Sequence, residues 1–160
     1  YFLHLAEVAW LLIDSGVRDE ALIAAAYLHD SIEDCEYDER SLADALGNVR
    51  VAALVAAVSE IDKGQSWETR QQQYRERLAT LDEPATLALS CADKTANLMD
   101  MNRLLARGHA VDSFTKRGFA PQQAKFEALD RLFQGRVPER LYQRFQQALA
   151  EFRERGRPPA

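Results

Sequence analysis

The sequence predicts an all-α protein, and three observations support that fold class. In most segments apolar residues recur three or four positions apart, the spacing of one face of an α-helix. Sustained apolar–polar alternation, the pattern of a half-buried strand, is absent from the sequence, and no Asn-Gly turn separates β-rich runs. Glycines, prolines and helix-capping residues stand between the apolar segments, where helices begin and end.

The N-terminal part of the chain predicts two helices. Apolar residues recur at helical spacing over residues 2–15, and Gly16 is placed to stop this first helix. Asp19 is placed to cap the second helix, because its carboxylate can accept the unpaired N–H groups of the first turn. We expect this second helix to continue without a break to Asp34.

Two shorter helices are expected next. The first covers residues 41–46, with Ser41 and Asp44 spaced as a capping box and Gly47 at the end. The second is an apolar helix over residues 49–61.

Serine and proline mark the start of the remaining helices. Ser66 can cap a polar helix, and Pro84 lies in the first turn of a long apolar one. A turn-rich segment follows over residues 109–118. Helices are therefore expected over residues 67–80, 82–105, 121–133 and 138–155.

Composition narrows the classes of function. The 160 residues, 47% of them hydrophobic, suffice for one domain over 1–160, with a core of about 1–105 and C-terminal helices over about 113–155. The net charge of −5 argues against a nucleic-acid polymer as partner but leaves room for a small phosphorylated ligand. Cys35 and Cys91 form no CxxC motif, which favours a reducing cytoplasm. Apolar runs reach about eight residues, so we expect no membrane span. The oligomeric state is not predicted.

One segment concentrates the groups that carry chemistry. At about 100° per residue on one helix, His29, Asp30, Glu33 and Asp34 fall at roughly 0°, 100°, 40° and 140° and share a face. Carboxylates are rarely buried unless they are paired or bind a metal. The cluster is therefore either a solvated helix end or a metal and catalytic site.

Two further residues are candidate metal ligands. His4 lies on the first helix, where taken alone it reads as a core histidine. Asp93 interrupts a long apolar helix and shares a face with Asn97, which fits either a structural ion pair or a ligand. Together His4, His29, Asp30 and Asp93 offer two nitrogen and two oxygen donors. Such a set suits a divalent ion such as manganese, iron or magnesium.

Other residues complete this hypothetical site. Glu33 and Asp34 would orient or deprotonate a water molecule, which metal-assisted hydrolysis requires. Lys63, Arg70 or Arg75 could reach a phosphate if the polar helix that follows Lys63 borders the site. His109 follows Gly108 and is expected at the surface.

These residues resemble the signature of a known family. The order His4, His29-Asp30, Asp93 is similar to that of the HD-domain metal phosphohydrolases. The resemblance is closest to the hydrolase domain of RelA/SpoT homologues, including the small stand-alone alarmone hydrolases. It covers roughly residues 1–102. Four segments carry it in the family's order: residues 1–4 (YFLH), 24–34 (AAAYLHDSIED), 42–59 and 92–98 (ADKTANL).

The resemblance implies a fold, a reaction and a set of roles. The fold would be an HD-domain helical bundle, and the reaction the removal of the 3′-pyrophosphate of ppGpp or pppGpp to give GDP or GTP. Alternatives are an HD enzyme for another nucleotide or phosphate ester, a metal-bearing sensor domain, and a helical interaction domain without metal. The implied roles are manganese binding by His4, His29, Asp30 and Asp93, catalysis by Glu33 and Asp34, and substrate binding by Asn97 and Lys94.

Overall fold

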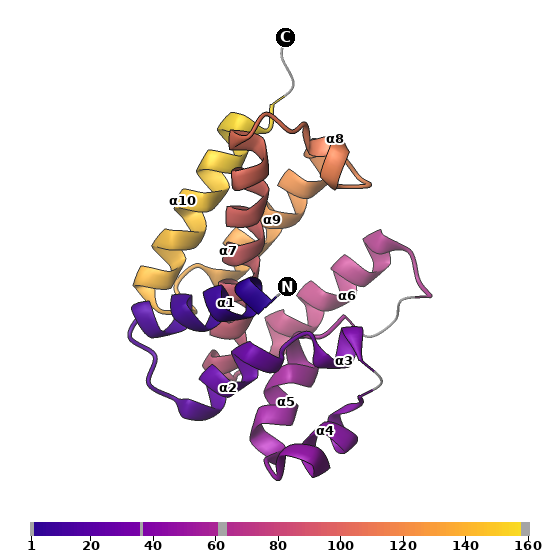
Figure 1. Cartoon of the computed structure of the whole chain (residues 1–160), viewed down its shortest axis with the longest axis vertical. Helices are drawn as coiled ribbons and strands as arrows, with labels where there is room; N and C mark the ends of the chain where they lie inside the picture. Colours follow the sequence, from indigo (N-terminus) through magenta and orange to yellow (C-terminus); the bar gives the residue numbers. More distant parts are fainter. Residues whose placement is uncertain (1, 36, 61–63, 158–160) are drawn as a thin grey trace.

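Helices form all the regular secondary structure in the computed structural model, which describes residues 2–35, 37–60 and 64–157 (Figure 1). No strand occurs in those ranges, so the predicted all-α fold class is confirmed. In chain order the helices are α1 (Phe2–Asp14), α2 (Glu20–Leu28), α3 (Ser31–Asp34), α4 (Glu39–Leu46), α5 (Val49–Val58), α6 (Trp67–Thr80), α7 (Pro84–Ala106), α8 (Val111–Phe114), α9 (Phe119–Phe133) and α10 (Glu139–Arg155).

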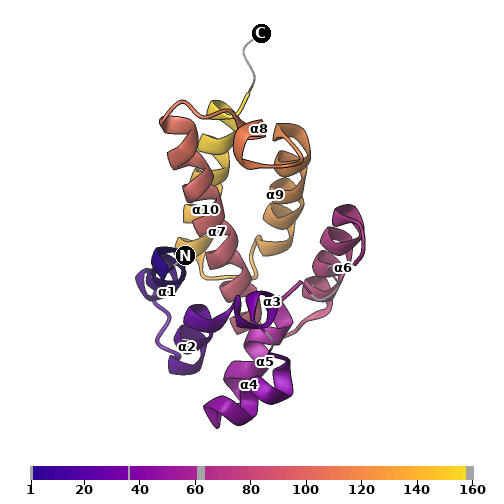
Figure 2. The same ribbon diagram turned by 45° about the vertical axis from the view of Figure 1, so that its right-hand side comes forward.

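The long helix α7 organises the fold. It packs against α1, α2 and α5 from the first half of the chain and against α9 and α10 from the second. Figures 1 and 2 show α10 and α9 alongside its upper half and α1, α2 and α5 around its lower half. Every residue of α7 from Thr86 to Ala96 is buried. Asp93 therefore lies in the most enclosed part of the molecule.

Side-chain caps explain where several helices begin. The carboxylate of Asp19 accepts hydrogen bonds from the backbone N–H groups of Ala21 and Leu22, which starts α2 as predicted. The hydroxyl of Ser66 accepts the N–H of Thr69 at 3.1 Å and starts α6, also as predicted. Such caps satisfy N–H groups that have no partner inside the helix.

The expected start of α4 is wrong by two residues. Asp38 is its cap: the carboxylate accepts the backbone N–H of Ser41, and the Ser41 hydroxyl accepts the N–H of Asp38. Ser41 therefore forms the third helical position of a capping box with Asp38, and the proposed pairing with Asp44 does not occur. Gly47 ends the helix with φ 61°, a conformation that suits glycine.

The expectation of one unbroken helix from residue 20 to Asp34 is also wrong. Helix α2 ends at Leu28, and the short α3 begins at Ser31. Between them Asp30 has φ −91° and ψ −4°, close to the bridge region in which many active-site residues lie. Leu28 and Ile32 keep apolar residues four positions apart across this point, so helical periodicity does not mark the turn.

The C-terminal helices close the core with aromatic side chains. Phe133 of α9 and Phe145 of α10 are fully buried, and their rings meet edge to face with centroids 5.3 Å apart. The predicted turn-rich segment contains the single-turn α8, and His109 before it is exposed, as predicted. Among the described helices, none is both long enough and apolar enough to cross a bilayer.

Replacing Phe145 by alanine is expected to destabilise the fold by about 3–5 kcal/mol, because it removes a fully buried ring and leaves a cavity. Denaturant unfolding followed by circular dichroism measures this loss. The matched control is Phe2→Ala, since the Phe2 side chain is 76% exposed and its removal should change stability little. Equal stability of the two variants would contradict the packing described here.

Candidate metal centre and active site

Four side chains from three parts of the chain meet beside α7. His4 comes from the first turn of α1, His29 and Asp30 from the turn between α2 and α3, and Asp93 from the middle of α7. Asp93 Oδ1 lies 3.3 Å from His4 Nε2 and 3.5 Å from His29 Nε2. Asp30 Oδ1 lies 3.2 Å from His29 Nε2. The structure thus brings together all four residues proposed from the sequence as metal ligands.

The ring of His29 is oriented as a ligand. Its Nδ1 lies 2.8 Å from the carbonyl oxygen of Ala26, and because a carbonyl only accepts, Nδ1 carries the hydrogen. In the neutral ring, the other nitrogen, Nε2, therefore carries the lone pair, and it faces Asp30 and Asp93. Nε2 is buried and has no hydrogen-bond partner among the described residues. A buried polar atom without a partner calls for an explanation, and a metal ion between these donors supplies one.

The ionisable side chains Asp93, Lys94 and His29 are buried side by side at the site. Burial by itself would raise the pKa of Asp93, but Lys94 and the two histidines hold it well below its usual range. Lys94 Nζ lies 2.7 Å from Asp93 Oδ2. Burial lowers the pKa of His29, but the carboxylates of Asp93 and Asp30 outweigh it and raise the pKa to about 9. The two carboxylates therefore favour a positive charge between them, whether a proton on His29 or a metal ion in its place.

The donor set fits a divalent metal ion. The candidate ligand atoms of His4, His29 and Asp30 lie within 4.8 Å of one another, and Asp93 Oδ1 is 3.5 Å or less from both histidines. Two imidazole nitrogens and carboxylate oxygens suit first-row divalent ions, and the exposed fraction of Asp30 leaves one side open to water and substrate. The four residues therefore form a candidate metal centre, called the metal centre below.

Lys94 and Asn97 both bind the metal ligand Asp93. Asn97 Nδ2 donates to Asp93 Oδ1 at 2.8 Å, one helical turn away, as their shared face predicted. Lys94 is buried and lies over the ring of Tyr74 at 5.1 Å from its centroid. Each carboxylate oxygen of Asp93 thus has a donor of its own. The predicted roles of Lys94 and Asn97 in substrate binding stay predictions.

Glu33 and Asp34 occupy different environments, contrary to the expectation of one common helix face. Glu33 is half-buried, and its Oε1 accepts the backbone N–H of Glu60 at 2.7 Å. Burial raises the pKa of Glu33, and the nearby charges of Glu60 and Asp30 raise it further against the effect of Lys94. Asp34 is exposed, although its charge still raises the pKa of Asp30. Glu33 and Asp34 are consecutive residues of α3 and lie about 100° apart around its axis, so only Glu33 faces the protein.

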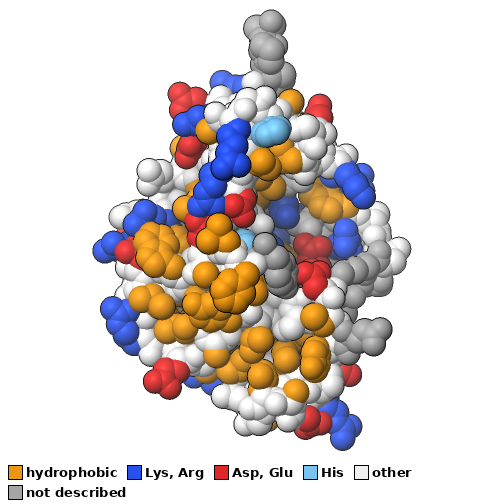
Figure 3. Space-filling model, viewed as in Figure 1, with side chains coloured by type: hydrophobic (Ala, Val, Ile, Leu, Met, Phe, Trp, Pro, Cys, Tyr) orange, Lys and Arg blue, Asp and Glu red, His pale blue; other side chains and the backbone are white. Residues whose placement is uncertain are grey.

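A polar wall lies opposite the candidate metal ligands, and of its residues the sequence pointed only to Arg70. Gln71 of α6 is buried and donates to Glu60 Oε1 at 2.8 Å, and Arg70 lies 3.7 Å from the same carboxylate. Lys125 of α9 also faces this region: burial and the charge of Lys94 lower its pKa to about 8. Figure 3 shows the result, a hollow between α7 and α6 in which basic and acidic side chains meet. Lys63, also expected near a phosphate, lies outside the described residues.

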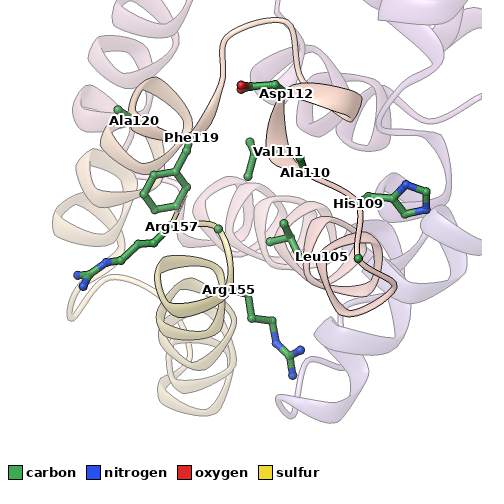
Figure 4. Close-up of a pocket in the computed structure, with 11 residues that line it drawn as sticks. Leu105, His109, Ala110, Val111, Asp112, Phe119, Ala120, Arg155 and Arg157 are labelled. Carbon is green, nitrogen blue, oxygen red and sulfur yellow. The ribbon is translucent and has the colours of Figure 1, made fainter. Parts of the chain in front are cut away.

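A cavity of about 550 Å³ lies at the far end of the molecule (Figure 4). Leu105, Val111 and Phe119 form its apolar lining. The polar ends of His109 and Arg155 point away from its centre, and Arg155 pairs with Glu151. This cavity contains none of the residues of the metal centre.

The fold and the metal centre agree with the family comparison. The HD domain family matches residues 1–124, so this chain belongs to the HD domain family. Curated relatives bear out the predicted resemblance to the RelA/SpoT-type hydrolases. The Danio rerio guanosine-3′,5′-bis(diphosphate) 3′-pyrophosphohydrolase MESH1 is 34% identical over 109 residues, which cover 68% of this chain and 59% of the relative. Its Mus musculus counterpart is 29% identical, with coverage of 85% and 80%.

Longer relatives and solved structures add to this comparison. A pyrophosphohydrolase of the same name from Aquifex aeolicus is 33% identical over 99 residues, and the match spans only 14% of that protein. The crystal structure of lmo0812 from Listeria monocytogenes superposes with a TM-score of 0.81 at 29% identity, covering 95% of this chain and 96% of that one. A metazoan orthologue of SpoT that hydrolyses ppGpp has the same fold, with a TM-score of 0.75 at 23% identity over 98% and 82% of the chains.

Proposed function

We propose that this chain is a metal-dependent phosphohydrolase that removes the 3′-pyrophosphate from ppGpp and pppGpp, giving GDP and GTP. The observation that carries the proposal is the convergence of four donor side chains: the buried Nε2 of His29 faces the carboxylates of Asp30 and Asp93, and His4 faces the same oxygen of Asp93. The activity of the curated relatives supports the choice of substrate.

His4, His29, Asp30 and Asp93 would hold the ion, and we infer manganese from this borderline nitrogen and oxygen donor set. When bound, the metal supplies a Lewis acid that polarises the phosphoryl group and acidifies water. The protein holds the donors in place: the Ala26 carbonyl fixes the His29 ring, and Lys94 fixes Asp93.

Glu33 is the proposed general base. Burial raises its pKa, which brings a carboxylate closer to the range in which it can accept a proton at neutral pH. In the reaction, water attacks the phosphorus attached to the ribose 3′ oxygen, and Glu33 takes the water proton. The bond between that phosphorus and the 3′ oxygen breaks, the oxygen leaves as a hydroxyl after protonation, and pyrophosphate is released. Asp34, exposed beside Glu33, would pass the proton to solvent.

Substrate binding is proposed for the cationic and amide groups around the hollow. Asn97 and Lys94 lie at the metal-ligand side, and Lys125 contributes a further positive charge from α9. A small phosphorylated nucleotide is therefore the proposed partner. We place the protein in the cytoplasm, a proposal supported by its two free thiols, Cys35 and Cys91.

A substrate panel tests the proposed specificity. We expect the purified chain with Mn²⁺ to convert ppGpp to GDP and pppGpp to GTP, with equimolar pyrophosphate, as resolved by anion-exchange chromatography. GTP and GDP, which have no 3′-phosphate, should stay intact because the scissile bond is missing. Cleavage of a different phosphate ester in preference to ppGpp would assign the site to another substrate of the same reaction class.

A further inference from the structure

The two histidines of the metal centre are held in different ways. Both present Nε2 to Asp93 Oδ1, at 3.3 Å for His4 and 3.5 Å for His29. The Nδ1 of His29 is fixed by a carbonyl of its own helix. The Nδ1 of His4 instead faces a carboxylate on another helix, Asp100 Oδ2 of α7, at 3.8 Å. The ring of His4 thus depends on a residue distant in sequence.

Asp100 is itself held by two further charged residues. Arg103, one turn along α7, donates from Nη1 to Asp100 Oδ1 at 2.5 Å. The same guanidinium makes a two-pronged contact with Glu7 of α1, from Nη1 to Oε2 at 3.0 Å and from Nη2 to Oε1. Glu7 lies one turn after His4 on α1. The contacts from Asp100 through Arg103 to Glu7 therefore connect α7 to the helix that carries His4.

We propose that Asp100, clamped by Arg103 and Glu7, is a positioning residue that orients His4 for metal binding. Asp100 Oδ2 faces Nδ1 of His4 at 3.8 Å, so its charge favours the ring tautomer with the hydrogen on Nδ1 and the lone pair of Nε2 directed at the metal centre. A carboxylate behind a ligating histidine fixes the ring and raises its basicity. This inference rests on the metal site of the proposed function. It adds to that site three residues, Asp100, Arg103 and Glu7, that are not themselves metal ligands.

The position of His4 explains why such a clamp is needed. His4 lies in the first turn of α1, where the neighbouring side chains Phe2 and Leu3 are 76% and 77% exposed. That end of α1 therefore has few apolar contacts, although the His4 side chain is only 15% exposed and its ring lies against that of His29, with centroids 5.3 Å apart. Arg103 links α1 to α7 just beyond it, and its two-pronged geometry sets direction as well as distance.

Mn²⁺ affinity of the metal-free protein, measured by electron paramagnetic resonance of free Mn²⁺, tests the proposal without any assay of activity. We expect Asp100→Ala to weaken binding by about 10–100-fold, the range typical of a residue behind a ligand. Asp112→Ala, a change of the same type at the far end of the molecule, is the matched control and should bind as the parent does. Unchanged affinity of Asp100→Ala beside a metal-binding parent would overturn the clamp alone. A parent that binds no Mn²⁺ would overturn the metal site itself.

The variant Arg103→Gln distinguishes a positioning role from a purely electrostatic one, because the two predict opposite changes in Mn²⁺ affinity. Removing a positive charge near a cation site strengthens Mn²⁺ binding if only charge matters. The clamp predicts the opposite, weaker binding by about 3–10-fold, because Asp100 is released. Tighter binding by Arg103→Gln would contradict the proposal even if Asp100→Ala failed to fold.

A double-mutant cycle shows whether Asp100 acts through His4. In a His4→Ala background, Asp100→Ala should weaken Mn²⁺ binding by less than about twofold, since there is no ring left to orient. In a His29→Ala background it should retain its full effect. An equal loss of Mn²⁺ affinity in both backgrounds would show that Asp100 acts on the metal independently of His4. That result would contradict the proposal.

Discussion

Replacing Asp93 by asparagine is expected to abolish metal binding and to destabilise the fold. Each oxygen of Asp93 accepts one hydrogen bond, from Lys94 and from Asn97, and Oδ1 also faces both histidines. An amide can accept at one position only, so its NH₂ group would point at a donor or into the metal site. We expect Mn²⁺ affinity to fall at least ~100-fold, more than the loss of a residue behind a ligand.

Asp93→Asn also leaves the buried charge of Lys94 without a carboxylate partner. This loss should cost about 3–5 kcal/mol of stability. Calorimetric Mn²⁺ titration and denaturant unfolding measure the two effects separately. The double variant Asp93→Asn/Lys94→Met should recover stability without recovering metal binding. Recovery of both would mean that Asp93 supports the fold but does not bind the metal.

Glu33→Gln is expected to keep the metal and to lose turnover. A glutamine can still accept the Glu60 N–H through its amide oxygen, so the contact at 2.7 Å and the fold should survive. It cannot take a proton, and loss of a general base lowers the rate by about 10²–10⁴-fold. The exposed Glu39 of α4 provides the control change Glu39→Gln, which should leave the rate unaltered.

The pH profile gives an independent readout of Glu33. Because burial raises its pKa above the ordinary 4.5, more of the group is protonated at a given acidic pH. A base works in its ionised form, so the rate should fall as pH drops through this raised pKa and recover as pH rises. The acid limb should disappear in Glu33→Gln. A residual rate near that of the parent, with the limb intact, would remove Glu33 from the mechanism.

Local chemistry made much of the fold predictable. Asp19 and Ser66 cap the helices that the sequence assigns to them, since an N-cap depends only on residues two or three positions away. Asp93 could be found because a carboxylate in an apolar helix needs a partner. The turn at Asp30 could not be found, because the apolar pattern continues across it and contacts with other helices decide where α2 ends.

The remaining parts of the site depend on long-range contacts. Gln71 lies in a polar helix that reads as a solvated face, yet the structure buries it against Glu60. Lys125 and Asp100 lie on helices whose local patterns indicate only ordinary surface charge. Their proximity to the metal centre follows from how α9 and α1 pack on α7, and periodicity within one helix carries no information about that packing.

Release of pyrophosphate from ppGpp tests the central claim most directly. The protein is stripped of metal with a chelator, dialysed, and assayed with and without added Mn²⁺. We predict no release from the stripped protein, and restored release of one pyrophosphate per GDP when Mn²⁺ is added. Release that continues undiminished without metal, or Mn²⁺ bound at this site with ppGpp left intact, would contradict the proposed function.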